Sequence, residues 1–133
     1  MCVFCKIIDG SIPSYKVFED SEVLAFLDLS QLTIGHTLVI PKKHVENIFE
    51  LDSNTASNLF ERVVLVANLL KKNLNINDIN LINNNGKLAS QTVNHYHIHL
   101  LPRYENDEFK FSSLPNKLSE EDFLILKEQI SKK

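Results

Sequence analysis

The chain has 133 residues, 44% of them hydrophobic, which is enough for the core of one globular domain. Its formal net charge of −3 argues against broad electrostatic binding of nucleic acid, which needs a basic face. No apolar run approaches the roughly 18 residues of a membrane span, and the N-terminus lacks the apolar region of a signal peptide. We therefore expect a cytoplasmic protein with neither a nucleic acid nor a membrane as its partner.

Cys2 and Cys5 open the sequence in a C-x-x-C spacing. Two cysteines in a reducing compartment do not favour a structural disulfide. The spacing alone leaves three interpretations open: half of a zinc site, a redox pair, or two incidental small residues. The redox interpretation is the weakest, because no strand and helix of the thioredoxin kind follow.

Three strands are predicted next, at residues 15–19, 23–28 and 35–41. The first two form a hairpin around an acidic turn, and Pro41 ends the third. Asp28 is unusual because it is an acid at the end of an apolar run. It is either a turn or cap residue, or a carboxylate that accepts hydrogen bonds from the hydroxyls of a sugar.

One long helix is predicted from about Asn54 to Lys72, with Asp52 or Ser53 as its N-cap. Its apolar residues lie on more than one side, which suggests packing on a sheet and against a second subunit. A deeply buried helix would show the same pattern, so the dimer is a hypothesis. A fourth strand is predicted at residues 79–83, followed by a turn-rich polar loop.

Three of the five histidines lie at alternate positions in the stretch 91–102, which organises the chain. This alternation is typical of a β-strand that presents His95, His97 and His99 on one face. The other face carries Tyr96, Ile98 and Leu100 into a core. Pro102 lacks a backbone donor and is predicted to end the strand. At about 3.3 Å per residue the three imidazoles span roughly 13 Å, so one metal ion cannot easily hold all three. We therefore expect a divided site, in which one end of the row can bind a metal ion and the other histidines are free for other chemistry.

Residues 105–133 form a charged C-terminal extension that ends in a helix, for which Ser119 is the predicted N-cap. Acidic residues follow this cap, as expected for the first turn of a helix.

Four segments together resemble the histidine triad (HIT) family of nucleotide-binding hydrolases and transferases. They are Phe4-Cys5-Lys6-Ile7-Ile8, Phe26-x-Asp28, Gly35-His36-x-Leu38-Val39-Ile40-Pro41-Lys42-Lys43-His44 and His95-x-His97-x-His99. The resemblance implies an α+β fold, with an antiparallel sheet, one long helix and a C-terminal helix, and usually a homodimer. Residues 1–133 would then be a single HIT-like domain, with a core at about 2–104 and the extension at 105–133.

The resemblance also implies a covalent mechanism. His97 matches the nucleophile that attacks the α-phosphate of a nucleotide, and water would cleave the resulting nucleotidyl-histidine. His36 and His99 match the histidines that contact phosphate and hold the nucleophile in place. A neutral imidazole, with an ordinary pKa of about 6.5, suits this chemistry without a metal at the phosphate.

A purine nucleotide is the implied substrate, and Asp28 matches the acid that binds its ribose. The other implied contacts are Phe4, Ile7, Phe26 and Leu29 around the base, and Asn84, Gln91 and Thr92 near the phosphate. Ser90 stands where the family commonly has glycine, so a tighter approach of the backbone to phosphate is expected.

Some members of the family carry a structural zinc ion. Cys2, Cys5, His44 and His95 match that four-ligand pattern, a closed Cys2His2 site. This assignment leaves His97 and His99 for the phosphate. In the alternative interpretation the cysteines are free thiols and His95 only forms hydrogen bonds.

The leading hypothesis is a nucleotide hydrolase or nucleotidyl transferase that acts through His97. Two substrate classes remain open: nucleoside phosphoramidates and dinucleoside polyphosphates. The competing hypothesis is a non-catalytic purine-nucleotide binder or a zinc-stabilised interaction module.

Overall fold

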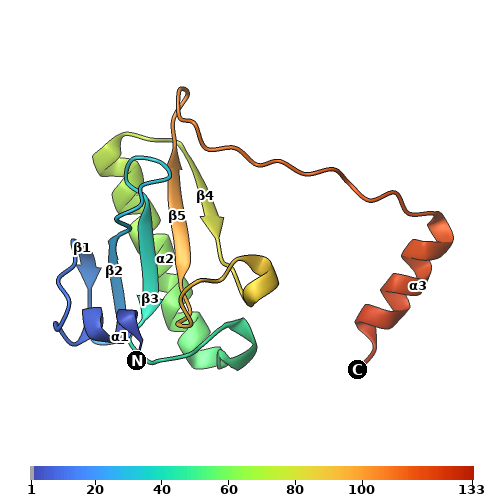
Figure 1. Cartoon of the computed structure of the whole chain (residues 1–133), viewed down its shortest axis with the longest axis horizontal. Coiled ribbons are helices and arrows are strands. Elements are labelled where there is room, and N and C mark those ends of the chain that lie inside the picture. Colours follow the sequence, from blue (N-terminus) through green and yellow to red (C-terminus); the bar gives the residue numbers. More distant parts are fainter. Residues whose placement is uncertain (1) are drawn as a thin grey trace.

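The computed structural model describes residues 2–133 and shows an antiparallel sheet with a long helix across one face (Figure 1). The strands are β1 (Lys16–Glu19), β2 (Val23–Leu27), β3 (Thr37–Pro41), β4 (Asp78–Ile82) and β5 (Ile98–Arg103). Their spatial order is β1-β2-β3-β5-β4. The helices are α1 (Val3–Ile8), α2 (Ser53–Leu74) and α3 (Glu120–Ser131), and the short 3-10 turns are η1 (Ile48–Glu50) and η2 (Lys87–Ala89). The α+β fold class predicted from the sequence is confirmed.

The long helix α2 forms where its caps and apolar spacing place it. The Asp52 side chain accepts a hydrogen bond from the Thr55 backbone N–H, and the helix ends at Asn75 in the left-handed conformation. Its buried stripe repeats at helical spacing and consists of Leu59, Val63, Val66 and Leu70. The predicted helix is confirmed, with ends that differ by one or two residues.

The sheet has a separate apolar cluster on each face, because successive side chains of a strand point to opposite sides. On one face, Ala25 and Val39 pack with the buried stripe of α2. On the other face, Leu24 and Phe26 pack with Phe4 of the short helix α1. The N-terminal helix therefore covers the face opposite α2, and the candidate site lies on the α1 face.

The predicted strand, which carried the alternating residues from His95 and was ended by Pro102, was wrong at both ends. β5 begins only at Ile98, because the preceding backbone groups bond elsewhere. The Tyr96 N–H donates to the Val45 carbonyl, and the His97 carbonyl accepts from the Asn83 side chain. Pro102 does not end the strand, which continues to Arg103. The missing donor is tolerated because, beyond Leu100, β5 pairs with β4 alone.

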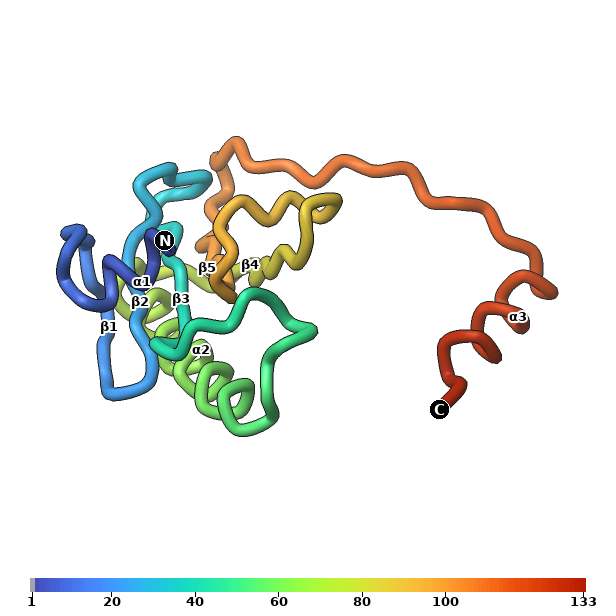
Figure 2. The backbone as a smooth tube through the Cα atoms, turned by 60° about the horizontal axis from the view of Figure 1, so that its bottom comes forward, coloured from blue at the N-terminus to red at the C-terminus, as the bar shows by residue number. Residues whose placement is uncertain are grey.

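Residues after β5 leave the sheet and end in α3, away from the rest of the chain (Figure 2). Ser119 caps α3 in a reciprocal capping box with Asp122, as its sequence predicted. Within residues 2–133, none of the helices has the length and apolarity needed to cross a membrane.

Candidate active site and metal site

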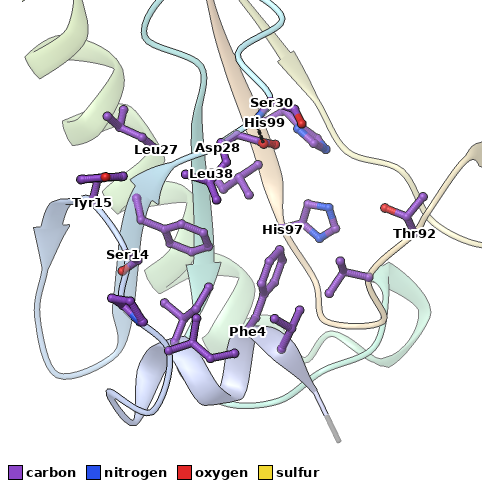
Figure 3. A pocket seen from close by; sticks show the side chains of 17 residues that line it. Phe4, Ser14, Tyr15, Leu27, Asp28, Ser30, Leu38, Thr92, His97 and His99 are labelled. Carbon is purple, nitrogen blue, oxygen red and sulfur yellow. Dashed lines mark hydrogen bonds between the residues drawn. The ribbon is translucent and has the colours of Figure 1, made fainter.

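A cavity of about 690 Å³ opens between α1, the end of β2 and the start of β5 (Figure 3). Most of the residues proposed to bind nucleotide line it: Phe4, Ile7, Phe26, Asp28, Leu29, Thr92, His97 and His99. Its apolar wall comes from α1 and β2, and Asp28, Thr92, His97 and His99 supply polar groups. This division suits a ligand with one flat apolar part and one charged part.

His97 is held in a single tautomer by the backbone. Its Nδ1 lies 2.7 Å from the carbonyl oxygen of His95, which can only accept, so Nδ1 carries the proton. The lone pair is therefore on Nε2. Figure 3 shows the ring between the side chains of Phe4 and Thr92. The Phe4 ring meets it edge-on, with the centroids 5.2 Å apart.

His36 and His99 form a hydrogen-bonded pair beside His97. His36 Nε2 lies 2.9 Å from His99 Nδ1, so one hydrogen is shared between these facing nitrogens and the other nitrogen of His99 is left for the cavity. The centroid of the His99 ring is 5.0 Å from that of His97. His36 is 1% exposed, does not line the cavity and contacts His99, which does.

Asp28 adopts the turn role that its sequence position left open, and its carboxylate also lies at the cavity. One carboxylate oxygen accepts the Ser30 backbone N–H at 2.8 Å, as a turn residue does. The other lies 3.6 Å from His36 Nε2, and the residue also lines the cavity. A carboxylate remains available to a ligand at the end of β2.

The histidines of the site favour their neutral forms. Burial lowers the pKa of His97 and of His36 below the ordinary value of 6.5, although Asp28 opposes the shift. The pKa of His99 falls to about 4, first because of burial and then because of its neighbours His97 and His36. At neutral pH the imidazole of His97 therefore keeps its lone pair.

The loop before the histidines lies beside the cavity lining and is held by its own hydrogen bonds. Asn84, Ser90 and Gln91 do not line the cavity. Gln91 braces the loop, because its side chain donates to the Glu46 and Val93 carbonyls and accepts the Gly86 N–H. Ser90 lies in the left-handed region with φ of 68°. Glycine adopts this conformation without strain, which gives a physical reason for the glycine of the family pattern.

Asn83 is a site residue that the sequence analysis did not identify. Its Nδ2 donates to the His97 carbonyl oxygen at 2.8 Å, and its Oδ1 accepts from Asn85 at 2.6 Å. It fixes the backbone that carries the candidate nucleophile. The available signal was weak, since Asn83 is one of three consecutive asparagines in a polar loop.

Cys2, Cys5, His44 and His95 lie in a second cluster, with their ligand atoms all within 4.8 Å of one another. His44 Nδ1 is 3.1 Å from His95 Nδ1, and the sulfur–nitrogen distances between pairs are 3.3 to 3.7 Å. A tetrahedral zinc ion with ordinary bond lengths places two nitrogens about 3.3 Å apart and sulfur and nitrogen about 3.6 Å apart. The four residues therefore fit such an ion.

The protonation of His95 suits a metal ligand. Its Nε2 lies 2.8 Å from the Pro41 carbonyl oxygen, so this nitrogen carries the proton and Nδ1 faces the cysteines with its lone pair. The Nδ1 atoms of His44 and His95 face each other, and a cation between them could be bound by both. The cluster also ties α1 to the end of β3, because Cys5 Sγ lies 3.3 Å from His44 Nδ1 and His95 Nε2 bonds to the Pro41 carbonyl oxygen.

The family comparison matches a model described as "HIT domain" over residues 9–106. The protein called "Protein hit" of Bacillus subtilis is 52% identical over 103 residues, which cover 77% of this chain and 71% of that protein. "Adenosine 5'-monophosphoramidase hnt1" of Schizosaccharomyces pombe is 37% identical over 136 residues, covering 99% of this chain and 97% of that one.

Solved structures give the same result. A HIT family protein from Bacillus subtilis superposes with a TM-score of 0.92 at 44% identity, over 98% of this chain and 94% of that chain. A zinc-bound histidine triad protein from Mycobacterium smegmatis superposes with a TM-score of 0.77 at 35% identity, over 86% of this chain and 84% of that chain.

Fold and site together define an α+β protein whose conspicuous feature is a row of buried and partly buried histidines beside an apolar cavity. With the family match, the chain belongs to the HIT family.

Proposed function

We propose that this protein is a nucleotide hydrolase or nucleotidyl transferase that acts through a covalent intermediate on His97. The observation that carries the proposal is the fixed tautomer of His97, which leaves the Nε2 lone pair in a buried ring at the wall of the cavity. A neutral imidazole with a lowered pKa is available as a nucleophile over a wide pH range.

In the proposed reaction, His97 Nε2 attacks the α-phosphorus and forms an N–P bond. The bond from phosphorus to the leaving group breaks, and the leaving group takes a proton from water in the open cavity. A second water then attacks phosphorus and gives a proton to the hydroxide left by the first, the N–P bond breaks, and the neutral imidazole is restored. His99 lies beside this centre, and its free nitrogen is proposed to contact a phosphate oxygen, with His36 holding the His99 ring.

The nucleoside is proposed to lie along the apolar wall, with a purine base against Phe4, Ile7, Phe26 and Leu29. Asp28 is proposed to accept hydrogen bonds from the ribose hydroxyls and Thr92 to contact the phosphate, and the support is that both residues line the cavity. Ser90 and Gln91 would affect nucleotide binding indirectly, through the shape of the loop, which the side chain of Gln91 holds by hydrogen bonds. Asn84, in the same loop, is the remaining proposed contact.

Nucleoside phosphoramidates are favoured over dinucleoside polyphosphates as the substrate class. The support is the 37% identity, over almost the whole chain, to a protein named as an adenosine 5′-monophosphoramidase. Parallel assays with adenosine phosphoramidate and diadenosine tetraphosphate separate the two classes. Faster turnover of the tetraphosphate would reverse the assignment.

Mass spectrometry of the protein quenched in base during turnover is the direct test, since an imidazole N–P bond survives alkaline conditions. A nucleotidyl group on His97 is expected, and it should be missing from His97→Ala. If the wild-type protein turns over no substrate, and His97→Ala binds AMP equally well, the protein is a non-catalytic purine-nucleotide binder or an interaction module instead.

We also propose a structural Zn²⁺ held by Cys2, Cys5, His44 and His95, supported by the tetrahedral spacing of these groups and by the zinc-bound relative. A bound ion would fix α1, and with it the Phe4 wall of the cavity. Elemental analysis of gently purified protein should find about one zinc per chain, and a clean absence would remove this proposal.

A cytoplasmic homodimer completes the proposal. The outer side of α2 exposes Phe60, Val64 and Leu65, each about half accessible, as the two-sided apolar pattern of this helix suggested. Within the described residues, β4 is an edge strand that pairs only with β5.

A further inference from the structure

Asp28, His36 and His99 form a further group of metal-binding side chains, distinct from the four residues proposed to hold zinc. One ligand atom of each lies within 4.8 Å of those of the other two. His36 Nε2 is 2.9 Å from His99 Nδ1 and 3.6 Å from an oxygen of the Asp28 carboxylate. Asp28 and His99 line the cavity, and Figure 3 labels them at the same end of it. The three donor groups therefore surround one point at the edge of the cavity.

The spacing of this group is close to that of a tetrahedral transition-metal site. Bonds of about 2.0–2.1 Å to nitrogen and 2.0–2.2 Å to oxygen place two nitrogens about 3.3 Å apart, and a nitrogen and an oxygen about 3.4 Å apart. The observed distances are 2.9 and 3.6 Å, so small side-chain rotations are enough to accept an ion. Two imidazoles and one carboxylate are typical ligands of such metals, and three protein ligands leave a further position open for water.

The hydrogen bonds of His36 direct a lone pair toward this point. Its Nδ1 lies 3.1 Å from the Ser30 carbonyl oxygen, which only accepts, and 3.3 Å from the Leu32 N–H, which only donates. The shorter contact places the proton on Nδ1, so Nε2 carries the lone pair. An ion would replace the hydrogen between the two rings, and that hydrogen would move to Nε2 of His99. Each neutral ring then offers one unprotonated nitrogen to the ion.

The loop between β2 and β3 already orients two of the three ligands. The Asp28 backbone N–H donates to the His36 carbonyl at 3.0 Å, and the Gln31 side chain donates to the carbonyls of both residues. One carboxylate oxygen of Asp28 accepts the Ser30 N–H at 2.8 Å, and the other faces His36. Such hydrogen bonds fix the direction of metal ligands, and oriented ligands lose little freedom when an ion binds.

We propose that Asp28, His36 and His99 bind one divalent transition-metal ion such as Zn²⁺, and that this ion competes with the nucleoside. The ion enters from the cavity, where the Asp28 side chain is 23% exposed, whereas His36 is only 1% exposed. The carboxylate oxygen that binds the ion is no longer free to accept a ribose hydroxyl. The competition rests on the proposed nucleotide function, and the metal site does not. The ion takes no part in the proposed reaction, and loading the site turns the reaction off.

A cobalt titration of the full chain tests the metal site, because Co²⁺ takes the place of zinc and its absorption reports the ligands. Thiolate ligands give an intense charge-transfer band in the near ultraviolet, whereas histidine and carboxylate ligands give only weak visible bands. Ions held by Cys2 and Cys5 are therefore told apart from ions at the new site. Mg²⁺ prefers oxygen ligands, and an excess of it should not displace the cobalt.

Two variants and one matched control locate the site. Asp28→Asn removes the charge of the ligand, and its amide oxygen can still accept the Ser30 N–H. His99→Gln removes a nitrogen ligand. Asp9→Asn is the control, because Asp9 accepts the Ser11 N–H at the same distance of 2.8 Å in a turn outside the group. Circular dichroism confirms that equal amounts of folded protein are compared.

Wild-type protein should bind one Co²⁺ ion per chain that gives visible bands without the thiolate band. Asp28→Asn and His99→Gln should each weaken this binding about tenfold or more, and Asp9→Asn should leave it unchanged. Cobalt that binds only with the thiolate band would overturn the inference. Visible-band binding that both variants retain would also overturn it, since the ligands would then lie elsewhere.

Adenosine tests the competition, because it carries the ribose and has no phosphate that would bind cobalt in solution. At about five times the dissociation constant of adenosine, the apparent dissociation constant of Co²⁺ should rise about sixfold. Adenosine that binds without weakening the binding of Co²⁺ would overturn the competition. If adenosine itself does not bind, the proposed nucleotide function fails instead, and the cobalt titration still decides the metal site.

Discussion

Phe4 offers the sharpest test of how the N-terminal helix supports the site. Its side chain is 6% exposed and meets three rings edge-on, those of Phe26, His95 and His97, at centroid distances of 5.5, 5.9 and 5.2 Å. Such pairs contribute about 0.5–1.5 kcal/mol each beyond area burial. Phe4→Leu keeps most of the apolar volume and loses this geometry, so the free energy of unfolding should fall by about 2–3 kcal/mol.

The same substitution should reduce catalysis by a smaller amount. The contact with His97 is one of the three, and losing about 1 kcal/mol of orientation corresponds to a fall in kcat of roughly fivefold. Urea unfolding with zinc saturated and steady-state turnover of adenosine phosphoramidate measure the two effects. Lys6→Ala, on the same helix but outside the cavity lining, is the matched control. If Phe4→Leu unfolds within 0.5 kcal/mol of wild type and keeps its kcat within twofold, then the ring contacts do not hold the nucleophile.

Three other outcomes are expected. Asn83→Ala removes the 2.8 Å hydrogen bond to the His97 carbonyl, so steady-state kinetics should show kcat reduced about tenfold with KM nearly unchanged. The urea concentration at half-unfolding should decrease when the pH is lowered from 7 to 5. An unfolded histidine binds a proton below about pH 6.5, whereas His99, with its pKa of about 4, stays neutral in the folded protein. A midpoint that rises as the pH falls would contradict the burial of this ring. Ser90→Gly relieves the left-handed φ of 68° and should raise the free energy of unfolding by about 0.5 kcal/mol in calorimetry, whereas Ser90→Val should lower it.

Local patterns in the sequence determined a large part of this protein. The apolar spacing from Leu59 to Leu70 specified α2 and its buried stripe, and Ser119 with Asp122 specified the start of α3. The alternation around His97 correctly separated the residues that enter the core from the histidines. These features are readable because each depends on side-chain direction within one short segment, which the period of a helix or strand fixes.

Only the tertiary structure decided which distant groups meet. His44 and His95 are 51 positions apart, and His36 and His99 are 63 apart, yet each pair approaches to within about 3 Å. Sheet register and loop closure set these pairings, and neither has a local period. β5 starts at Ile98 because the backbone before it forms hydrogen bonds with the Val45 carbonyl and the Asn83 side chain. Strand propensity contains no information about these distant partners. Alternate positions in the sequence predict that two rings share a face of a strand. Only the folded backbone determines which residues lie opposite those rings.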